Sequence, residues 1–199
     1  MLHRDAEGAE VWDWHDGQYQ ARHHLTVVEA AARRHISINA HEPIKDTGLR
    51  RTYPNWVSRE GARGMEYQAW GDPPNPPEHE PNLVFTRMLS GPMDFTPGIV
   101  SLTGKGGREI PSTLARQLAN FVVIYSPVQM AADLPEHYEQ RPQALAFIKR
   151  VPVDWEETRV IGGAIGDYAI FARQRRGGPG WDVGGVTDEK ARQGTGDFA

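Results

Sequence analysis

One stretch, residues 17–40, limits the fold more than any other, because it pairs a helical pattern with a short apolar segment. Apolar side chains recur in it at steps of four, three and four: Ala21, Leu25, Val28 and Ala32. This stripe predicts a helix that buries one face, with Asp16 available as its N-cap. The segment HISINA, residues 35–40, follows at once and stops at His41 and Glu42, which predicts a buried strand ending at a functional loop. A helix followed by such a strand is typical of an α/β unit with a parallel sheet.

The middle of the chain alternates between irregular and regular patterns. Residues 71–81 hold five prolines and are expected to form an extended surface connection. Residues 83–98 are predicted to contain a second strand region, whose polar end includes Asp94. Apolar spacing predicts a helix from Ser112, the possible N-cap, to about residue 125, and a further helix after Pro142.

The pattern changes after Pro152. Short alternating or apolar runs, separated by glycine and aspartate, are typical of antiparallel strands and hairpins. We therefore predict a boundary near residues 150–165, with α/β structure before it and β structure after it.

Composition excludes several classes of function. The net charge of −4 and the pI of about 6.1 give no electrostatic reason to expect a nucleic acid as partner. No apolar run approaches the roughly 18 residues of a membrane span, so none is expected. The absence of cysteine from the 199 residues excludes disulfides and thiolate metal sites, so a metal would need oxygen or imidazole ligands.

Three glutamates, Glu42, Glu60 and Glu66, share the irregular stretch 41–67. Proline and glycine allow its backbone to double back and gather distant carboxylates. Clustered carboxylates serve either the hydrolysis of a glycosidic bond or the binding of a hard cation such as calcium. The same glutamates could instead form solvated ion pairs with neighbouring arginines: Arg50, Arg51, Arg59 and Arg63. His41 could equally be a structural histidine.

The six tryptophans of the chain leave a second question open. Tryptophan stacks well on sugars, yet Trp56, Trp70 and Trp155 would serve equally well in a hydrophobic core.

Several segments resemble one known family. The stretch NAHEPIKDTGLRRTYPNWVSREGARGMEY, residues 39–67, resembles the catalytic centre of glycoside hydrolase family 97, the calcium-dependent α-glucosidases and α-galactosidases. The resemblance continues through FTRMLSGPMDFTPGI, TLARQLANFVVIYSPVQMAADLPEHY, VPVDWEETRVI and GDYAIFARQ to VGGVTDE, and covers nearly the whole chain.

The resemblance implies a role for each residue of the stretch. Glu66 matches the general acid that protonates the glycosidic oxygen, and Glu60 matches a calcium ligand. Glu42 matches a residue that binds calcium and, in inverting members, helps to activate the attacking water, while His41 matches a residue that contacts the sugar. The implied cofactor is Ca²⁺, and the implied substrate is an α-glucoside oligosaccharide.

Position 42 also indicates the mechanism, because retaining members of the family carry glycine after the histidine. The glutamate of this chain resembles the inverting α-glucosidase branch. A retaining α-galactosidase of the same family and a non-catalytic calcium- or carbohydrate-binding fragment are the alternatives.

By resemblance, residues 1–155 are the second half of a (β/α)8 barrel and residues 156–199 the beginning of an antiparallel β-sandwich domain. A whole barrel takes about 250 residues, so further catalytic and calcium-binding residues are expected upstream of this chain, which is expected to be at best weakly active alone. The family's usual setting predicts a periplasmic protein, and the oligomeric state stays open.

Overall fold

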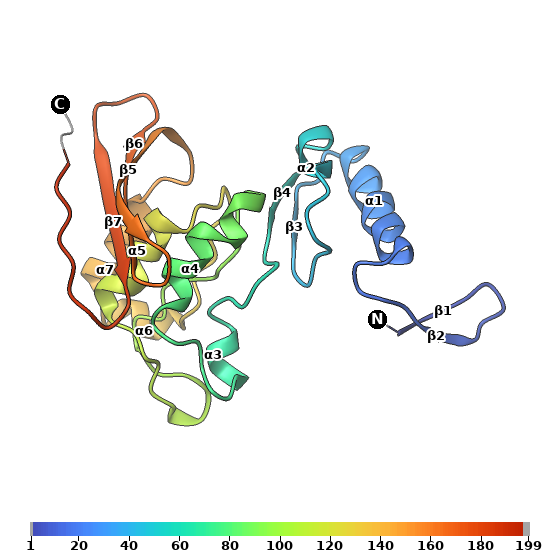
Figure 1. Ribbon diagram of the computed structural model, residues 1–199, viewed down its shortest axis with the longest axis horizontal. Helices are drawn as coiled ribbons and strands as arrows, with labels where there is room; N and C mark the ends of the chain where they lie inside the picture. Colours follow the sequence, from blue (N-terminus) through green and yellow to red (C-terminus); the bar gives the residue numbers. More distant parts are fainter. Residues whose placement is uncertain (1, 197–199) are drawn as a thin grey trace. The chain divides into compact units, whose positions relative to one another are not determined.

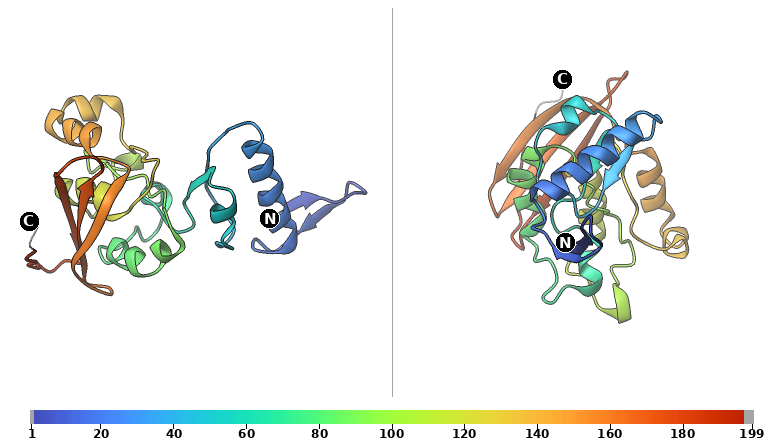
Figure 2. Two further views of the ribbon diagram at one scale, coloured as in Figure 1. Left: turned by 90° about the horizontal axis from the view of Figure 1, so that it is seen from above. Right: turned by 90° about the vertical axis from the view of Figure 1, so that its right-hand side faces the viewer.

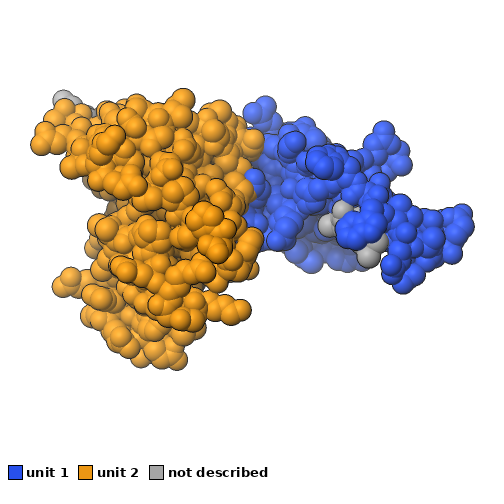
Figure 3. Space-filling view, turned by 60° about the horizontal axis from the view of Figure 1, so that its bottom comes forward, with its two compact units in different colours: residues 1–61 blue, residues 62–199 orange. Residues whose placement is uncertain are grey.

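The computed structural model describes residues 2–196. The chain divides into two compact units, residues 1–61 and residues 62–199, which Figure 3 shows in different colours. Each unit has a hydrophobic cluster of its own. Within the described part of the chain, no helix has the length and apolar content that crossing a membrane requires. The division at residue 155 into a barrel and a β-domain stays a prediction.

The first unit combines one long helix with two small sheets (Figure 1). Its elements are β1 (Leu2–Arg4), β2 (Glu10–Trp12), α1 (Gln18–Ala32), β3 (Ile38–Ala40), α2 (Leu49–Thr52) and β4 (Trp56–Arg59). Strands β1 and β2 form an antiparallel hairpin, whereas β3 and β4 are parallel. The predicted helix and the predicted parallel pairing are therefore confirmed. A closed barrel is not formed by residues 2–196.

Two details of the predicted helix and strand are wrong. Gly17, not Asp16, is the N-cap of α1, because the Asp16 carboxylate accepts a hydrogen bond from the Lys45 amide instead, at 2.8 Å. The strand expected over 35–40 begins only at Ile38. His35 has a left-handed backbone, with φ of 55°. The chain turns there after α1, so the first residues of the apolar segment belong to this connection and not to the strand. The core of this unit forms where α1 meets the sheet, around Val28, Ile44 and Trp56.

The second unit packs helices against a three-stranded antiparallel sheet of order β5–β6–β7 (Figure 2). Its elements are α3 (Tyr67–Trp70), α4 (His79–Phe85), η1 (Arg87–Ser90), η2 (Lys105–Gly107), α5 (Leu114–Val123), α6 (Pro135–Glu139), α7 (Pro142–Arg150), β5 (Trp155–Ala164), β6 (Tyr168–Arg175) and β7 (Trp181–Thr187). The predicted hairpins after Pro152 and the predicted helix after Pro142 are confirmed.

The strand region expected over residues 83–98 is wrong. Its first residues end helix α4, which begins inside the proline-rich segment. Pro81 fits in the first turn of α4 because the amide groups there have no partner within the helix. Met93 and Phe95 are buried in the core, but Met93 forms only an isolated β-bridge and Phe95 lies in irregular backbone. Leu89 of the same segment is 77% exposed, so neither the strand nor a uniform burial follows from this apolar run.

Helix α5 joins the sheet to the rest of the second unit. Its N-cap is Thr113, one residue after the predicted Ser112, and the Thr113 hydroxyl accepts a hydrogen bond from the Arg116 amide at 3.2 Å. Strand β7 approaches α5 so closely that a Cβ atom at Gly184 would lie 2.7 Å from the Cβ atom of Val122. This glycine lets sheet and helix pack backbone against side chain.

Candidate active-site residues

The carboxyl ends of the parallel strands β3 and β4 bring two predicted site residues together. Ala40 pairs with Arg59 in the register, and the Glu60 amide donates to the Ala40 carbonyl at 2.9 Å. His41 and Glu60 are the first residues beyond these strands, so they leave the sheet at the same edge. The His41 Nδ1 atom lies 3.7 Å from the Glu60 Oε2 atom. The positions are those expected of an α/β fold, whose functional side chains follow the ends of its strands.

Glu42 follows His41 in a backbone conformation that is unusual for its residue type. Its φ angle is +44°, in the left-handed region that costs a residue with a Cβ atom about 1–2 kcal/mol. Its side chain is exposed. A glycine would adopt this backbone without that cost. Glutamate therefore occupies a position whose backbone conformation favours glycine. Such strain is common at functional sites.

The loop that carries His41 and Glu42 is fastened by Asp46. The Asp46 carboxylate accepts hydrogen bonds from the Gly48 amide at 2.8 Å and from Arg50 Nε at 3.0 Å. Its Oδ2 atom also lies 3.0 Å from Nη2 of the buried Arg59 on β4. Burial alone would raise the pKa of Asp46, but the Gly48 amide and the two guanidinium groups outweigh it and lower that pKa. Two of the arginines considered as partners of the glutamates thus form ion pairs with this aspartate.

The same loop is also held from the side of α1. His15 Nε2 lies 3.2 Å from the Pro43 carbonyl, and the Asp16 carboxylate holds the Lys45 amide. Pro43 and Ile44 are buried. The loop is therefore fixed to the segment that leads into α1 and, through Asp46 and Arg59, to strand β4. Sequence reasoning missed the contacts of His15 and Asp16 because they join residues distant in the chain. The ion pair of Asp46 with Arg50 spans four positions, so this spacing is a signal that could have found it.

Glu66 belongs to the second unit, where it precedes helix α3. Its backbone is already helical, and its carbonyl accepts a hydrogen bond from the Ala69 amide at 2.9 Å. Met65 before it is buried, and the Met65 amide donates to the Phe95 carbonyl at 2.8 Å. The Glu66 side chain is exposed. The carboxyl group is thus presented to solvent from a turn that is anchored in the core.

The structure shows which of the three tryptophans considered for sugar stacking are buried and which is exposed. Trp56 and Trp155 are core residues, with 3% and 9% of their surface exposed. Trp70 lies on α3, four residues after Glu66, and is 65% exposed. Burial therefore excludes the first two from contact with a sugar and leaves the third available.

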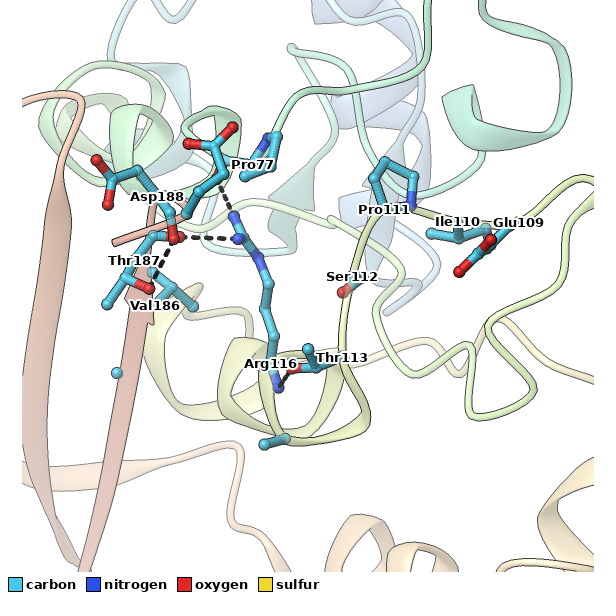
Figure 4. A pocket seen from close by; sticks show the side chains of 13 residues that line it. Pro77, Glu109, Ile110, Pro111, Ser112, Thr113, Arg116, Val186, Thr187 and Asp188 are labelled. Atoms are coloured by element: carbon cyan, nitrogen blue, oxygen red, sulfur yellow. Dashed lines mark hydrogen bonds between the residues drawn. The ribbon is translucent and has the colours of Figure 1, made fainter. Parts of the chain in front are cut away.

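A hollow of about 520 Å³ lies elsewhere in the second unit (Figure 4). Its 13 lining residues are Pro77, Glu109, Ile110, Pro111, Ser112, Thr113, Ala115, Arg116, Gly185, Val186, Thr187, Asp188 and Glu189. The Arg116 guanidinium donates hydrogen bonds to the Glu80 carboxylate and to the Pro77 and Thr187 carbonyls. None of the residues predicted to act on a substrate lines this hollow.

Two family models match the chain. The model described as "Glycoside hydrolase 97" matches residues 6–62, and the model described as "Glycosyl-hydrolase 97 C-terminal, oligomerisation" matches residues 154–199. A curated relative, "Retaining alpha-galactosidase" of Bacteroides thetaiotaomicron, is 35% identical over 185 residues, which cover 89% of this chain and 28% of that protein.

Two solved structures from Pseudoalteromonas sp. strain K8 are more similar. They show a glycoside hydrolase family 97 enzyme in complex with panose and with acarbose. Each is 55% identical and covers 96% of this chain and 30% of its own, with TM-scores of 0.90 and 0.88. The chain thus spans less than a third of the length of these relatives. From the two family models and the structural neighbours, the chain belongs to glycoside hydrolase family 97.

Proposed function

We propose that the protein hydrolyses α-glucosidic bonds with inversion of the anomeric configuration. The observation that carries the proposal is the glutamate at position 42, which has a left-handed backbone and directly follows His41, the residue whose Nδ1 atom lies 3.7 Å from the Glu60 carboxylate. A retaining member of the family, with glycine there, would have no carboxylate at this place. Support also comes from the 55% identical enzyme, which was solved with panose, an α-linked glucose trisaccharide.

The roles follow from what each carboxyl group can do. Glu66 donates a proton to the glycosidic oxygen as the bond to the leaving sugar breaks. Glu42 helps to remove a proton from the water that attacks the opposite face of the sugar ring, which inverts the configuration. His41, beside Glu60, contacts the sugar at the site of cleavage. Each of these side chains comes from the loop anchored by Asp46 or from the turn before α3.

The residues at the strand ends suit a calcium ion. Calcium takes six to eight oxygen ligands, and the Glu42 and Glu60 carboxylates supply part of such a set, with water and further residues supplying the remainder. Bound calcium would hold two carboxylates that otherwise repel each other and would polarise groups at the sugar. We assign Glu42 and Glu60 as the ligands that this chain contributes.

The parallel pair β3–β4 is proposed to be part of a (β/α)8 barrel in the whole protein. Such barrels carry their active sites at the carboxyl ends of the strands, where His41 and Glu60 lie. The antiparallel sheet β5–β7 is proposed to begin the C-terminal β-domain, in agreement with the family model over residues 154–199.

A retaining α-galactosidase is the second candidate, and the name of the curated relative favours it. The two candidates differ in the sugar and in the first product. Methyl α-maltoside is the substrate for this test, because its leaving sugar has no free anomeric centre. Proton NMR early in its hydrolysis should show β-glucose if the reaction inverts. Early release of α-glucose from it, or turnover of α-galactosides but not of α-glucosides, would contradict the proposal.

The acid role is tested by Glu66→Gln in the whole protein. Maltose needs protonation of its leaving sugar, so its turnover should fall by about 10²–10⁴-fold, whereas α-glucosyl fluoride, whose fluoride leaves without a proton, should react nearly as before. Glu139→Gln, an exposed residue of α6, is the matched control. Equal loss on both substrates would refute the acid role. Activity should also disappear with a chelator and return with calcium.

A further inference from the structure

Trp70 is an exposed tryptophan on the short helix α3, which directly follows Glu66. About 65% of its surface is in contact with solvent, whereas the indole ring is among the largest apolar surfaces a residue can offer. Tryptophan is also one of the residue types enriched among those that carry most of the energy of binding interfaces. Trp70 is therefore a candidate for contact with a ligand.

The neighbours of Trp70 hold its ring in place. The Tyr67 and Trp70 rings meet edge to face, with centroids 4.6 Å apart and planes 70° to each other. On Tyr67, the Arg63 guanidinium lies 4.8 Å from the ring centroid. The Tyr67 ring also covers the backbone of Gly71, where a Cβ atom would collide with the ring. The Trp70 ring is exposed but supported, and a preordered ring loses little entropy when a ligand binds.

The helical turn places Trp70 on the same side as Glu66. The two residues are four positions apart, and Glu66 has helical backbone angles, with φ of −55° and ψ of −34°, directly before α3. Side chains at positions i and i+4 of a helix are neighbours, with Cβ atoms roughly 5–6 Å apart. Both side chains are exposed. A sugar next to the Glu66 carboxyl group is therefore within reach of the Trp70 ring.

We infer that Trp70 is the stacking platform for the leaving-group sugar, the sugar that departs with the glycosidic oxygen. This inference rests on the proposed role of Glu66 as the acid. The acid touches the glycosidic oxygen, and the leaving sugar begins at that oxygen. The C–H groups on one face of a pyranose form an apolar surface that fits the face of an indole ring. Trp70 would thus favour oligosaccharides over α-glucosides with small leaving groups.

The test compares Trp70→Ala with Trp70→Phe in the whole protein, with maltotriose and α-glucosyl fluoride as substrates. Trp70→Ala should raise KM for maltotriose about tenfold, the effect of losing one stacking contact. The constants for the fluoride, which has no leaving sugar, should stay unchanged. Trp70→Phe keeps an aromatic face and should recover most of the affinity. Leu89→Ala removes another apolar side chain of the same unit, 77% exposed, and should change neither substrate.

Two outcomes would overturn the inference. An equal effect of Trp70→Ala on both substrates would mean that the residue supports the site rather than the sugar, and no effect on either would mean that no sugar stacks there. Failure of the proposed function has a different signature, because Glu66→Gln acts on kcat for maltotriose and Trp70→Ala on its KM. If the protein cleaves α-galactosides instead, the same comparison is made with raffinose and α-galactosyl fluoride.

Discussion

Replacing Glu42 by glycine is predicted to change stability and activity in opposite directions. The substitution removes the carboxylate proposed to assist the base and to bind calcium, and it also removes the Cβ atom from a residue with φ of +44°. Glu42→Ala is the matched control, because alanine lacks the carboxylate but keeps the Cβ atom and its conflict with the left-handed backbone.

The expected magnitude follows from two opposing terms. Glycine has no Cβ atom to clash in the left-handed conformation, which stabilises the folded state of the glycine variant by about 1–2 kcal/mol. The greater freedom of glycine in the unfolded chain opposes this by about 0.4–1 kcal/mol. Without metal, the loop of the glycine variant should therefore be more stable than that of the alanine variant by about 1 kcal/mol. Both variants should lose activity by about 10²–10⁴-fold.

Hydrogen exchange of the Glu60 amide measures this local stability. That amide donates to the Ala40 carbonyl at the end of the parallel pair, so it is exposed when the loop and strand open. In the presence of a chelator, a difference of about 1 kcal/mol makes exchange about fivefold slower in Glu42→Gly than in Glu42→Ala. Faster exchange in the glycine variant would refute the left-handed conformation, and full activity of either variant would refute the role of the carboxylate.

Two further predictions concern the second unit. Arg173 donates to the Val122 and Val123 carbonyls at 2.6 and 3.3 Å, and burial lowers its pKa to about 10, so it stays charged at neutral pH. Arg173→Met leaves these carbonyls at the end of α5 without that donor and should lower the free energy of unfolding by about 3 kcal/mol. Arg173→Lys should recover part of this loss, and an unchanged urea midpoint in Arg173→Met would contradict the prediction. Burial would raise the pKa of Asp133, but the His137 imidazole, at 2.5 Å, and two backbone amides lower it overall. A carboxylate with a lowered folded pKa stabilises the protein above its ordinary pKa of about 4 and loses this effect as the pH falls. The urea midpoint of the original protein should fall between pH 5 and pH 3, and that of Asp133→Asn should fall less. An equal fall in the two proteins would show that Asp133 does not contribute to the pH dependence of stability.

Local pattern was sufficient for much of the secondary structure. Helices α1, α5 and α7 were predicted because apolar residues at helical spacing must bury one face wherever the helix lies. The hairpins of β5–β7 were predicted from alternating runs and turn residues, which act over a few positions. The strand expected over residues 83–98 failed because an apolar run does not show the backbone conformation that accompanies it. Met93 and Phe95 are buried, but neither lies in a strand.

The sequence by itself determined which residues are candidates for chemistry, because carboxylates in an irregular stretch and their match to one family can be read from the order of residues alone. Only the tertiary structure decided which of them meet. It paired His41 with Glu60 through the parallel register of β3 and β4, and it showed the left-handed backbone of Glu42. It also exposed Trp70 while burying Trp56. The physical reason is the same in each case: burial, register and backbone strain depend on contacts between distant segments, which composition and spacing do not contain.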